Sequence, residues 1–202
     1  MLTTSQKQKI EDFHKFILRW GKKNGRSFIW RGSPTPYKVL IAEIFLQRTN
    51  ALQAEKQYIK FIKKYKNFHV LNNTRSADLN KFLFPLGLKK RMGTFKRMVS
   101  VINKKYNGRV PMDYSKLISL PGIGDYAASA VLLFAGKERR GLVDANTIRI
   151  FSKLFNKKIC REDGKRSKFI RNCSDYFSSM GKKPREANWY LLDYGAKLLK
   201  KT

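Results

Sequence analysis

The sequence contains 202 residues, of which 42% are hydrophobic and 13% aromatic, and this composition excludes a wholly disordered chain. It carries 44 Lys plus Arg against 14 Asp plus Glu, a formal net charge of +30. Such a charge repels itself in a compact state, so it favours a polyanionic partner, with a nucleic-acid backbone ahead of an anionic membrane. No window holds the roughly 18 apolar residues of a membrane span, and the N-terminus lacks a signal-peptide core, so we expect an intracellular protein of the cytoplasm or nucleoid.

Apolar residues recur at spacings of three and four along most of the chain, which is typical of helices. In chain order, the expected helices cover residues 5–21, a segment that starts at Pro36, and residues 51–65, 88–105, 125–137, 145–155, 165–179 and 185–200. Short segments rich in Gly, Pro and Asn separate them, at 32–36, 84–87, 107–111 and 120–124. No stretch alternates with period two, so the sequence predicts an all-α protein of about ten helices.

The most informative turn is Leu120-Pro121-Gly122-Ile123-Gly124, which separates two expected helices. Two glycines let the backbone approach a partner closely and adopt unusual dihedral angles. The free N–H groups at the start of the following helix favour an anion such as a DNA phosphate. The turn therefore predicts a helix-hairpin-helix DNA clamp, with an ordinary helix–helix turn as the alternative, and its carbonyl groups can also hold a monovalent cation.

Asp144 lies twenty residues after the hairpin, within Val143-Asp144-Ala145-Asn146, at the expected start of a helix. Taken alone, the aspartate is a good helix N-cap. A hairpin, a helix and an aspartate at this distance are the arrangement that defines the helix-hairpin-helix-Gly/Pro-Asp superfamily of DNA glycosylases.

The resemblance to this superfamily extends over nearly the whole chain. The matching segments resemble those of MutY-type adenine glycosylases and their thymine-mismatch relatives: Trp30-Arg31, Pro36-Tyr37, Glu43, Leu46-Gln47-Arg48-Thr49, Pro85-Leu86-Gly87-Leu88 and Asp193-Tyr194-Gly195. The resemblance implies an enzyme of base excision repair that flips the target base out of duplex DNA. It also implies two helical lobes with a DNA cleft between them: a six-helix barrel lobe over residues 24–132, and a lobe joining 1–23 to 133–202.

The resemblance assigns roles to four residues of the reaction. Breaking an N-glycosidic bond builds positive charge on the sugar, and the residue matching Asp144 stabilises it. Glu43 matches the acid that acts on the departing base, with a solvated helix carboxylate as the alternative. Asn146 matches a residue that orients the aspartate or a water. Tyr126 stands where strand-cutting relatives carry a Schiff-base lysine, so the resemblance implies a monofunctional glycosylase with little or no lyase activity.

Four further residues, outside the hairpin, are candidates for DNA contact. Gln47 and Arg48 match side chains that enter the gap left by the flipped base or read its partner; Thr49 completes that motif, and Arg31 belongs to the matching Trp-Arg pair. The alternative for the Gln47 segment is a solvated helix end.

The target base follows from finer differences. MutY-type enzymes usually carry Asp-Gly-Asn and Leu-Gln-Gln-Thr, whereas this chain has Ala145 and Arg48 at the variable positions. Together with Tyr126, these residues resemble the thymine or uracil mismatch glycosylases, and the additional MutY domain that reads oxidised guanine is missing from this sequence. We therefore expect removal of thymine or uracil opposite guanine. The alternatives are adenine opposite guanine or oxidised guanine, a lyase that uses another lysine, and a non-catalytic DNA-binding module.

No metal or cofactor is expected. Many relatives bind a [4Fe–4S] cluster through four C-terminal cysteines, but this sequence stops where that loop would begin, and Cys160 and Cys173 lie upstream of it. Two isolated cysteines without a neighbouring His also do not match a zinc site. The expected partner is double-stranded DNA with a mispaired or damaged base, bound by a monomer, with no membrane association.

Overall fold

The computed structural model describes residues 1–47, 49–136 and 138–198. Their regular structure is helical and contains no strand, which confirms the all-α prediction. The helices are α1 (Thr4–Asn24), α2 (Ile29–Gly32), α3 (Pro36–Phe45), α4 (Ala51–Lys64), α5 (Phe68–Asn72), α6 (Ser76–Leu83), α7 (Met92–Tyr106), α8 (Tyr114–Ile118), α9 (Asp125–Phe134), α10 (Ala145–Leu154), α11 (Arg161–Arg166), α12 (Lys168–Ser179) and α13 (Pro184–Leu198), with 3₁₀ helices η1 (Phe84–Leu86) and η2 (Lys89–Arg91).

Hydrophobic periodicity predicted the longer helices and overlooked α2, α5, α6, α8 and α11. These helices have 4, 5, 8, 5 and 6 residues. A helix of one or two turns offers too few positions for a stripe of period 3.6 to stand out. Their starts are instead marked by local caps: the side chains of Asn67 and Asp113 accept hydrogen bonds from Val70 N and Lys116 N at the starts of α5 and α8.

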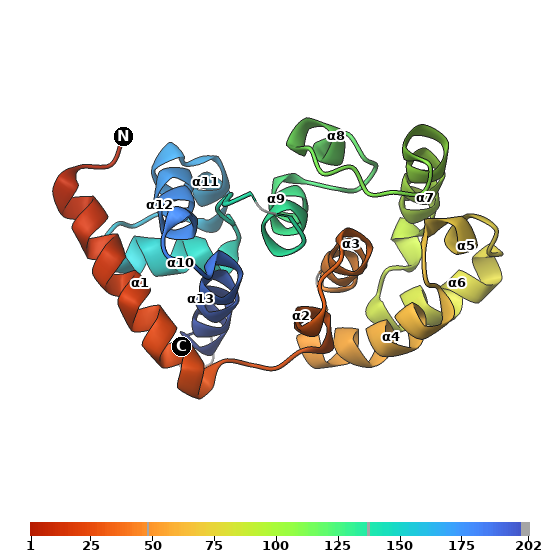
Figure 1. Ribbon diagram of the computed structural model, residues 1–202, viewed down its shortest axis with the longest axis horizontal. Coiled ribbons are helices and arrows are strands. Elements are labelled where there is room, and N and C mark those ends of the chain that lie inside the picture. The colour runs from red at the N-terminus through yellow and green to blue at the C-terminus, as the bar shows by residue number, and fades with distance from the viewer. Residues whose placement is uncertain (48, 137, 199–202) are drawn as a thin grey trace. The chain divides into compact units, whose positions relative to one another are not determined.

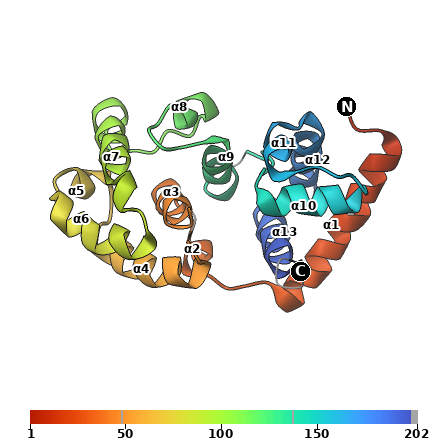
Figure 2. The same cartoon turned by 180° about the vertical axis from the view of Figure 1, so that it is seen from behind.

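The chain forms two compact units. The first consists of residues 1–27 and 137–202 and is called the terminal unit; the second consists of residues 28–136 and is called the central unit. The terminal unit therefore combines α1 with α10–α13, and the central unit contains α2–α9 (Figures 1 and 2).

The terminal unit is built around the packing of α1 against the last two helices. In Figure 1, α1 runs beside α13 although the two lie at opposite ends of the sequence, and α1 and α10 also contact α12. A capping box between Thr3 and Gln6 starts α1. The core side chains come from four of these helices and are almost fully buried: Ile10, Ile17, Phe151, Phe177 and Leu191.

The central unit packs α3 against α9 (Figure 2). Both helices are buried along most of their length, and Pro36 occupies the first turn of α3, as predicted. Aromatic rings fill much of the remaining core: Phe45, Phe61, Tyr65 and Phe68 are at most 2% exposed. The hairpin and the turn after α3 are thus attached to a rigid, buried pair of helices.

Across the described ranges, no helix combines the length and the apolar character that a bilayer span needs.

Candidate active site

The predicted hairpin is present between α8 and α9 in the central unit. Leu120 and Ile123 are buried, 2% and 6% exposed, and Ile123 N donates to Leu120 O over 3.1 Å. Pro121 is partly buried, whereas Gly122 and Gly124 are exposed. Two apolar side chains therefore anchor the turn in the core, while its glycines face outward.

The two glycines of the hairpin serve different purposes. Gly122 has φ +79°, and a Cβ there would lie 2.8 Å from Thr94 Cγ2. Gly124 has φ −102° and ψ 178°, which any residue adopts, and a Cβ there would meet nothing within 4 Å. The expectation of unusual dihedral angles is therefore right for Gly122 and wrong for Gly124. Gly124 is the N-cap of α9 without a side-chain cap, so space and free N–H groups coincide at that helix start.

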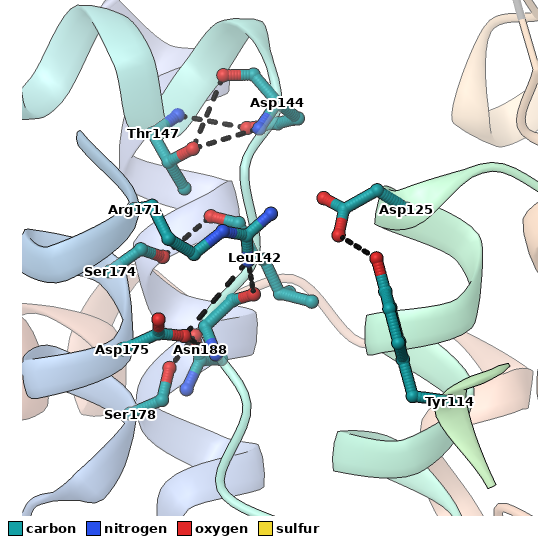
Figure 3. A network of polar contacts seen from close by, with 11 residues as sticks. Tyr114, Asp125, Leu142, Asp144, Thr147, Arg171, Ser174, Asp175, Ser178 and Asn188 are labelled. Carbon is teal, nitrogen blue, oxygen red and sulfur yellow. Dashed lines mark hydrogen bonds and ion pairs between the residues drawn. The ribbon is translucent and has the colours of Figure 1, made fainter. Parts of the chain in front are cut away.

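An acidic residue also lies at this helix start. Asp125 is the first residue of α9, and its Oδ1 accepts a hydrogen bond of 2.7 Å from the hydroxyl of Tyr114, the first residue of α8 (Figure 3). A carboxylate in the first turn stabilises the helix dipole. It competes with a phosphate for the same positive end of the helix.

Two segments that are distant in sequence meet in the central unit. Thr49 Oγ1 donates to Leu86 O over 3.0 Å, and Gln53 Nε2 donates to Pro85 O. Gln47 Oε1 accepts a hydrogen bond from Arg91 Nη1. The segment after α3 is thereby tied to the Pro-Leu-Gly-Leu turn and the residues that follow it, a partnership that sequence reasoning did not predict.

An apolar pocket connects these turns to the hairpin. Its lining includes Gln47 and Arg91 as well as Pro121, Gly122 and Ile123. Because guanidinium groups only donate hydrogen bonds, the Arg91 contact fixes the Gln47 amide oxygen and leaves the amide N–H groups to other acceptors. Of the residues predicted to contact DNA, Gln47 and residues 121–123 of the hairpin thus line one pocket. Arg48 lies outside the described residues.

Glu43 and Tyr126 belong to the packed helices α3 and α9 of the central unit. Glu43 is only 8% exposed, so the alternative of a solvated helix carboxylate is wrong for this residue. A carboxylate with so little contact with solvent needs polar partners within the protein. Tyr126 is partly buried at the second position of α9, two residues after Gly124. Arg31, on α2, places its guanidinium 5.2 Å from the ring centroid of Phe28 within the same unit.

Asp144 is the N-cap of α10 in the terminal unit, and both of its carboxyl oxygens are held. Oδ1 accepts from Thr147 N over 2.8 Å, and Oδ2 accepts from Asn146 Nδ2 over 2.8 Å. The Thr147 hydroxyl completes a capping box with Asp144 N at 2.9 Å (Figure 3). The capping role considered from the sequence is therefore real, and it fixes the orientation of the carboxyl group.

Burial and hydrogen bonds act in opposite directions on the pKa of Asp144. Burial of the carboxyl raises its pKa above the usual range, and this effect exceeds the lowering by the hydrogen bonds from Thr147 and Asn146. Loss of the hydrogen bond from either Thr147 or Asn146 would therefore raise the pKa of Asp144 further and favour the neutral carboxyl.

The segment before Asp144 is clamped to α12 by three hydrogen bonds, which the sequence did not reveal. Arg171 Nη1 donates to Gly141 O over 2.8 Å, Gly141 N donates to Asp175 Oδ1 over 2.8 Å, and Ser174 Oγ donates to Leu142 O over 2.6 Å (Figure 3). A Cβ on Gly141 would lie 2.3 Å from the Ser174 carbonyl carbon. The close approach requires glycine, and it fixes the backbone that leads into Asp144.

The Asp193-Tyr194-Gly195 motif supports the same helix start from α13. A Cβ on Gly195 would lie 2.5 Å from Asn146 Cβ, so glycine lets α13 pack directly on Asn146. Asp193, 3% exposed, accepts from Arg26 N over 2.8 Å and from Arg26 Nε over 2.7 Å. The motif thus ties α13 to both the start of α10 and the segment after α1.

The residues of the described ranges contain no group of three or more His, Cys, Asp or Glu that could hold a metal ion. Cys173 is buried and Cys160 is exposed at the start of α11. Two thiols in these different surroundings do not fit a [4Fe–4S] cluster, which takes four thiolate ligands.

No family model matches the chain, but the known proteins similar to it are DNA glycosylases. The chain is 35% identical over 153 residues to a thymine/uracil-DNA glycosylase of Methanothermobacter thermautotrophicus, covering 75% of this chain and 68% of that protein. It is 32% identical to an adenine DNA glycosylase of Buchnera aphidicola, of whose length it spans only 46%. Among solved structures, a thermostable thymine-DNA glycosylase matches with a TM-score of 0.84 and 31% identity, over 94% of this chain and 87% of that one.

Proposed function

The chain belongs to the endonuclease III/MutY-like family of DNA glycosylases, and from this membership we propose that it removes thymine or uracil mispaired with guanine. It is a DNA N-glycosylase of base excision repair. The single observation that carries the proposed chemistry is the Asp144 carboxyl, held by Thr147 N and Asn146 Nδ2 at the start of α10. This arrangement prepares a negative charge in one orientation before substrate binds.

The reaction breaks the bond between C1′ of the sugar and the base nitrogen. The bonding electrons leave with the base, and C1′ becomes cation-like before water adds its oxygen there. In the proposal, ionised Asp144 stabilises the sugar cation and Asn146 keeps the carboxylate oriented. Glu43 supplies a proton or a hydrogen bond to the departing base, which must first leave the duplex stack.

The proposal includes no strand cleavage. A Schiff base requires a primary amine at C1′, and Tyr126 offers a phenol at the position considered. The proposed product is therefore an intact strand with an abasic site. The proposed DNA contacts are the hairpin, Gln47, Arg48, Thr49 and Arg31, with the start of α9 taking a backbone phosphate.

The preference for thymine or uracil over adenine rests on two observations. The thymine/uracil relative is 35% identical to the chain and the adenine enzyme 32%, and the thymine-DNA glycosylase structure matches with a TM-score of 0.84. Ala145 also follows Asp144 where MutY-type enzymes usually carry glycine. We further propose that the chain acts as a monomer, without an iron–sulfur cluster, and that the hairpin carbonyls can bind a monovalent cation.

End-labelled duplexes test the proposal. Substrates with T:G, U:G, A:G and A opposite oxidised guanine are incubated with the protein and then either treated with alkali or left untreated. Cleavage of T:G and U:G only after alkali is the expected result. Cleavage at adenine alone would move the chain to the MutY-type activity, and binding without cleavage of any duplex would leave a non-catalytic DNA-binding module.

A further inference from the structure

A second pocket lies along α10, in the terminal unit. It is lined by Ala145, Ile148, Arg149, Ser152, Lys153 and Ile159. The first five share one face of α10 at spacings of three and four, and Ile159 comes from the segment that turns back after the helix. That segment is fixed by a hydrogen bond of 2.8 Å from Lys157 N to Ser152 O.

Two polar groups of this pocket have no hydrogen-bond partner among the described residues. Arg149 Nη1 and Ser152 Oγ are buried, and neither makes a hydrogen bond in the part of the chain that the structure describes. Ser152 as a whole is only 9% exposed. Buried donors almost always find an acceptor, so two orphan donors one turn apart in one pocket indicate that an acceptor is missing.

The chemistry of the lining identifies the missing acceptor. A guanidinium group only donates hydrogen bonds, in a fork that matches two oxygens of one anion. A serine hydroxyl donates a further bond, and Lys153 adds a second positive charge. We propose that the α10 pocket is a binding site for a phosphate-type oxyanion, held by Arg149 and Ser152.

Two sources can supply such an oxyanion: a DNA backbone phosphate and free inorganic phosphate. Arg149 follows Asp144 by five residues, which corresponds to about 7.5 Å along a helix axis, or roughly two nucleotides of one strand. A backbone phosphate near the target nucleotide would therefore suit the pocket. This source rests on the proposed function, whereas binding of inorganic phosphate does not.

The first arm of the test measures the thermal midpoint of the protein in sodium phosphate and in sodium chloride of equal ionic strength. The expected result is a higher midpoint in phosphate for the wild type, because a ligand that binds the native state stabilises it. Arg149→Gln and Ser152→Ala should lose this difference. Arg166→Gln should keep it, because Arg166 is exposed at the end of α11 and does not line the pocket.

The second arm measures duplex binding at several salt concentrations. If the oxyanion is a backbone phosphate, Arg149→Gln lowers the slope of log K against log salt by about 0.9, and Ser152→Ala weakens binding without removing a charge. If it is free phosphate, the slopes of Arg149→Gln and Arg166→Gln are equal while the thermal effect remains.

The proposal is overturned if phosphate and chloride give the wild type the same midpoint and Arg149→Gln has the slope of Arg166→Gln. Should Arg149→Gln not fold, Ser152→Ala decides, because it removes only a hydroxyl. Excision of uracil from a U:G duplex by the same variants is recorded separately, so that failure of the pocket and failure of the glycosylase proposal are told apart.

Discussion

The amide of Asn146 donates from Nδ2 to Oδ2 of Asp144 over 2.8 Å, and Gly195 of α13 packs closely against the same side chain. The position of this amide therefore depends on α13 as well as on its own helix. Because hydrogen bonds stabilise the charged carboxylate, Asn146 and Thr147 together orient Asp144 and lower its pKa against the effect of burial.

Replacing Asn146 should shift the pH dependence of excision. The hydrogen bond from Asn146 lowers the pKa of Asp144, so Asn146→Ala raises that pKa further above the ordinary value. The acidic limb of the single-turnover rate should move to higher pH, with a smaller loss of rate at alkaline pH. An acidic limb at the wild-type position would show that Asn146 does not tune this carboxyl.

Removing the charge of Asp144 should strongly reduce catalysis without unfolding the protein. Asparagine caps helices about as well as aspartate, so Asp144→Asn keeps the bond to Thr147 N and the thermal midpoint. Excision should fall on the order of 10²- to 10³-fold. The matched control is Asp113→Asn, the same substitution at the exposed N-cap of α8, which should retain activity. Equal losses in the two variants would contradict the catalytic role.

Alanine substitutions at the two hairpin glycines should affect protein stability and DNA binding differently. Gly122→Ala places a Cβ 2.8 Å from Thr94 Cγ2 at φ +79°, so it should lower the free energy of unfolding by about 1–3 kcal/mol. Gly124→Ala meets no atom within 4 Å and should cost only about 0.5 kcal/mol, because alanine is a poorer N-cap than glycine. Its methyl group stands at the start of α9, so it should weaken duplex binding. Urea unfolding and binding titrations measure the two effects, and a Gly124→Ala protein that binds as wild type would exclude a close backbone contact there.

The contact between Gln47 and Arg91 should appear as energetic coupling in DNA binding. Gln47→Ala, Arg91→Met and the double variant form a cycle, measured by binding to a T:G duplex in the Asp144→Asn background. We expect a coupling of about 0.5–3 kcal/mol, because Arg91 orients the amide that Gln47 presents. Arg97→Met, on the exposed side of α7, should be additive with Gln47→Ala. Additivity of Arg91→Met as well would mean that the two side chains act independently.

His14 should make the fold sensitive to mild acid. Burial lowers its pKa below the ordinary value of 6.5, and its ring lies 4.9 Å from that of Phe177. The unfolded chain therefore takes up the proton first, so stability is complete above pH 6.5 and falls as the pH drops below it. Urea midpoints between pH 5 and 8 should show this fall in the wild type and a smaller one in His14→Gln. If the urea midpoints of wild type and His14→Gln fall equally with pH, a group other than His14 is responsible for the acid sensitivity.

Much of the site could be predicted from the sequence because its signals are local. The hairpin consists of five consecutive residues, Asp144 and Asn146 are two apart, and the long helices repeat an apolar residue at every turn. The short helices were not predicted because a helix of one or two turns shows no clear periodicity of apolar residues. Their caps, such as Asp113 three residues before Lys116 N, were the signal that could have revealed them.

The supports of the site could not be predicted, because they join residues far apart in sequence. Gln47 and Arg91 are 44 positions apart, and Arg171 reaches Gly141 across 30. In the sequence, Arg91 is only the last residue of a run of three positive residues. Nothing in its neighbours along the chain distinguishes a charge that contacts solvent from one that orients an amide.

The sequence by itself determined the helical class, the hairpin and the chemical groups available for the reaction. The tertiary structure decided which oxygen of Asp144 each donor holds, which glycine is strained and which is open, and which arginines orient other groups. The physical reason is range: hydrophobic periodicity and turn chemistry act within a few residues, whereas desolvation and hydrogen bonding depend on every element that packs around a group.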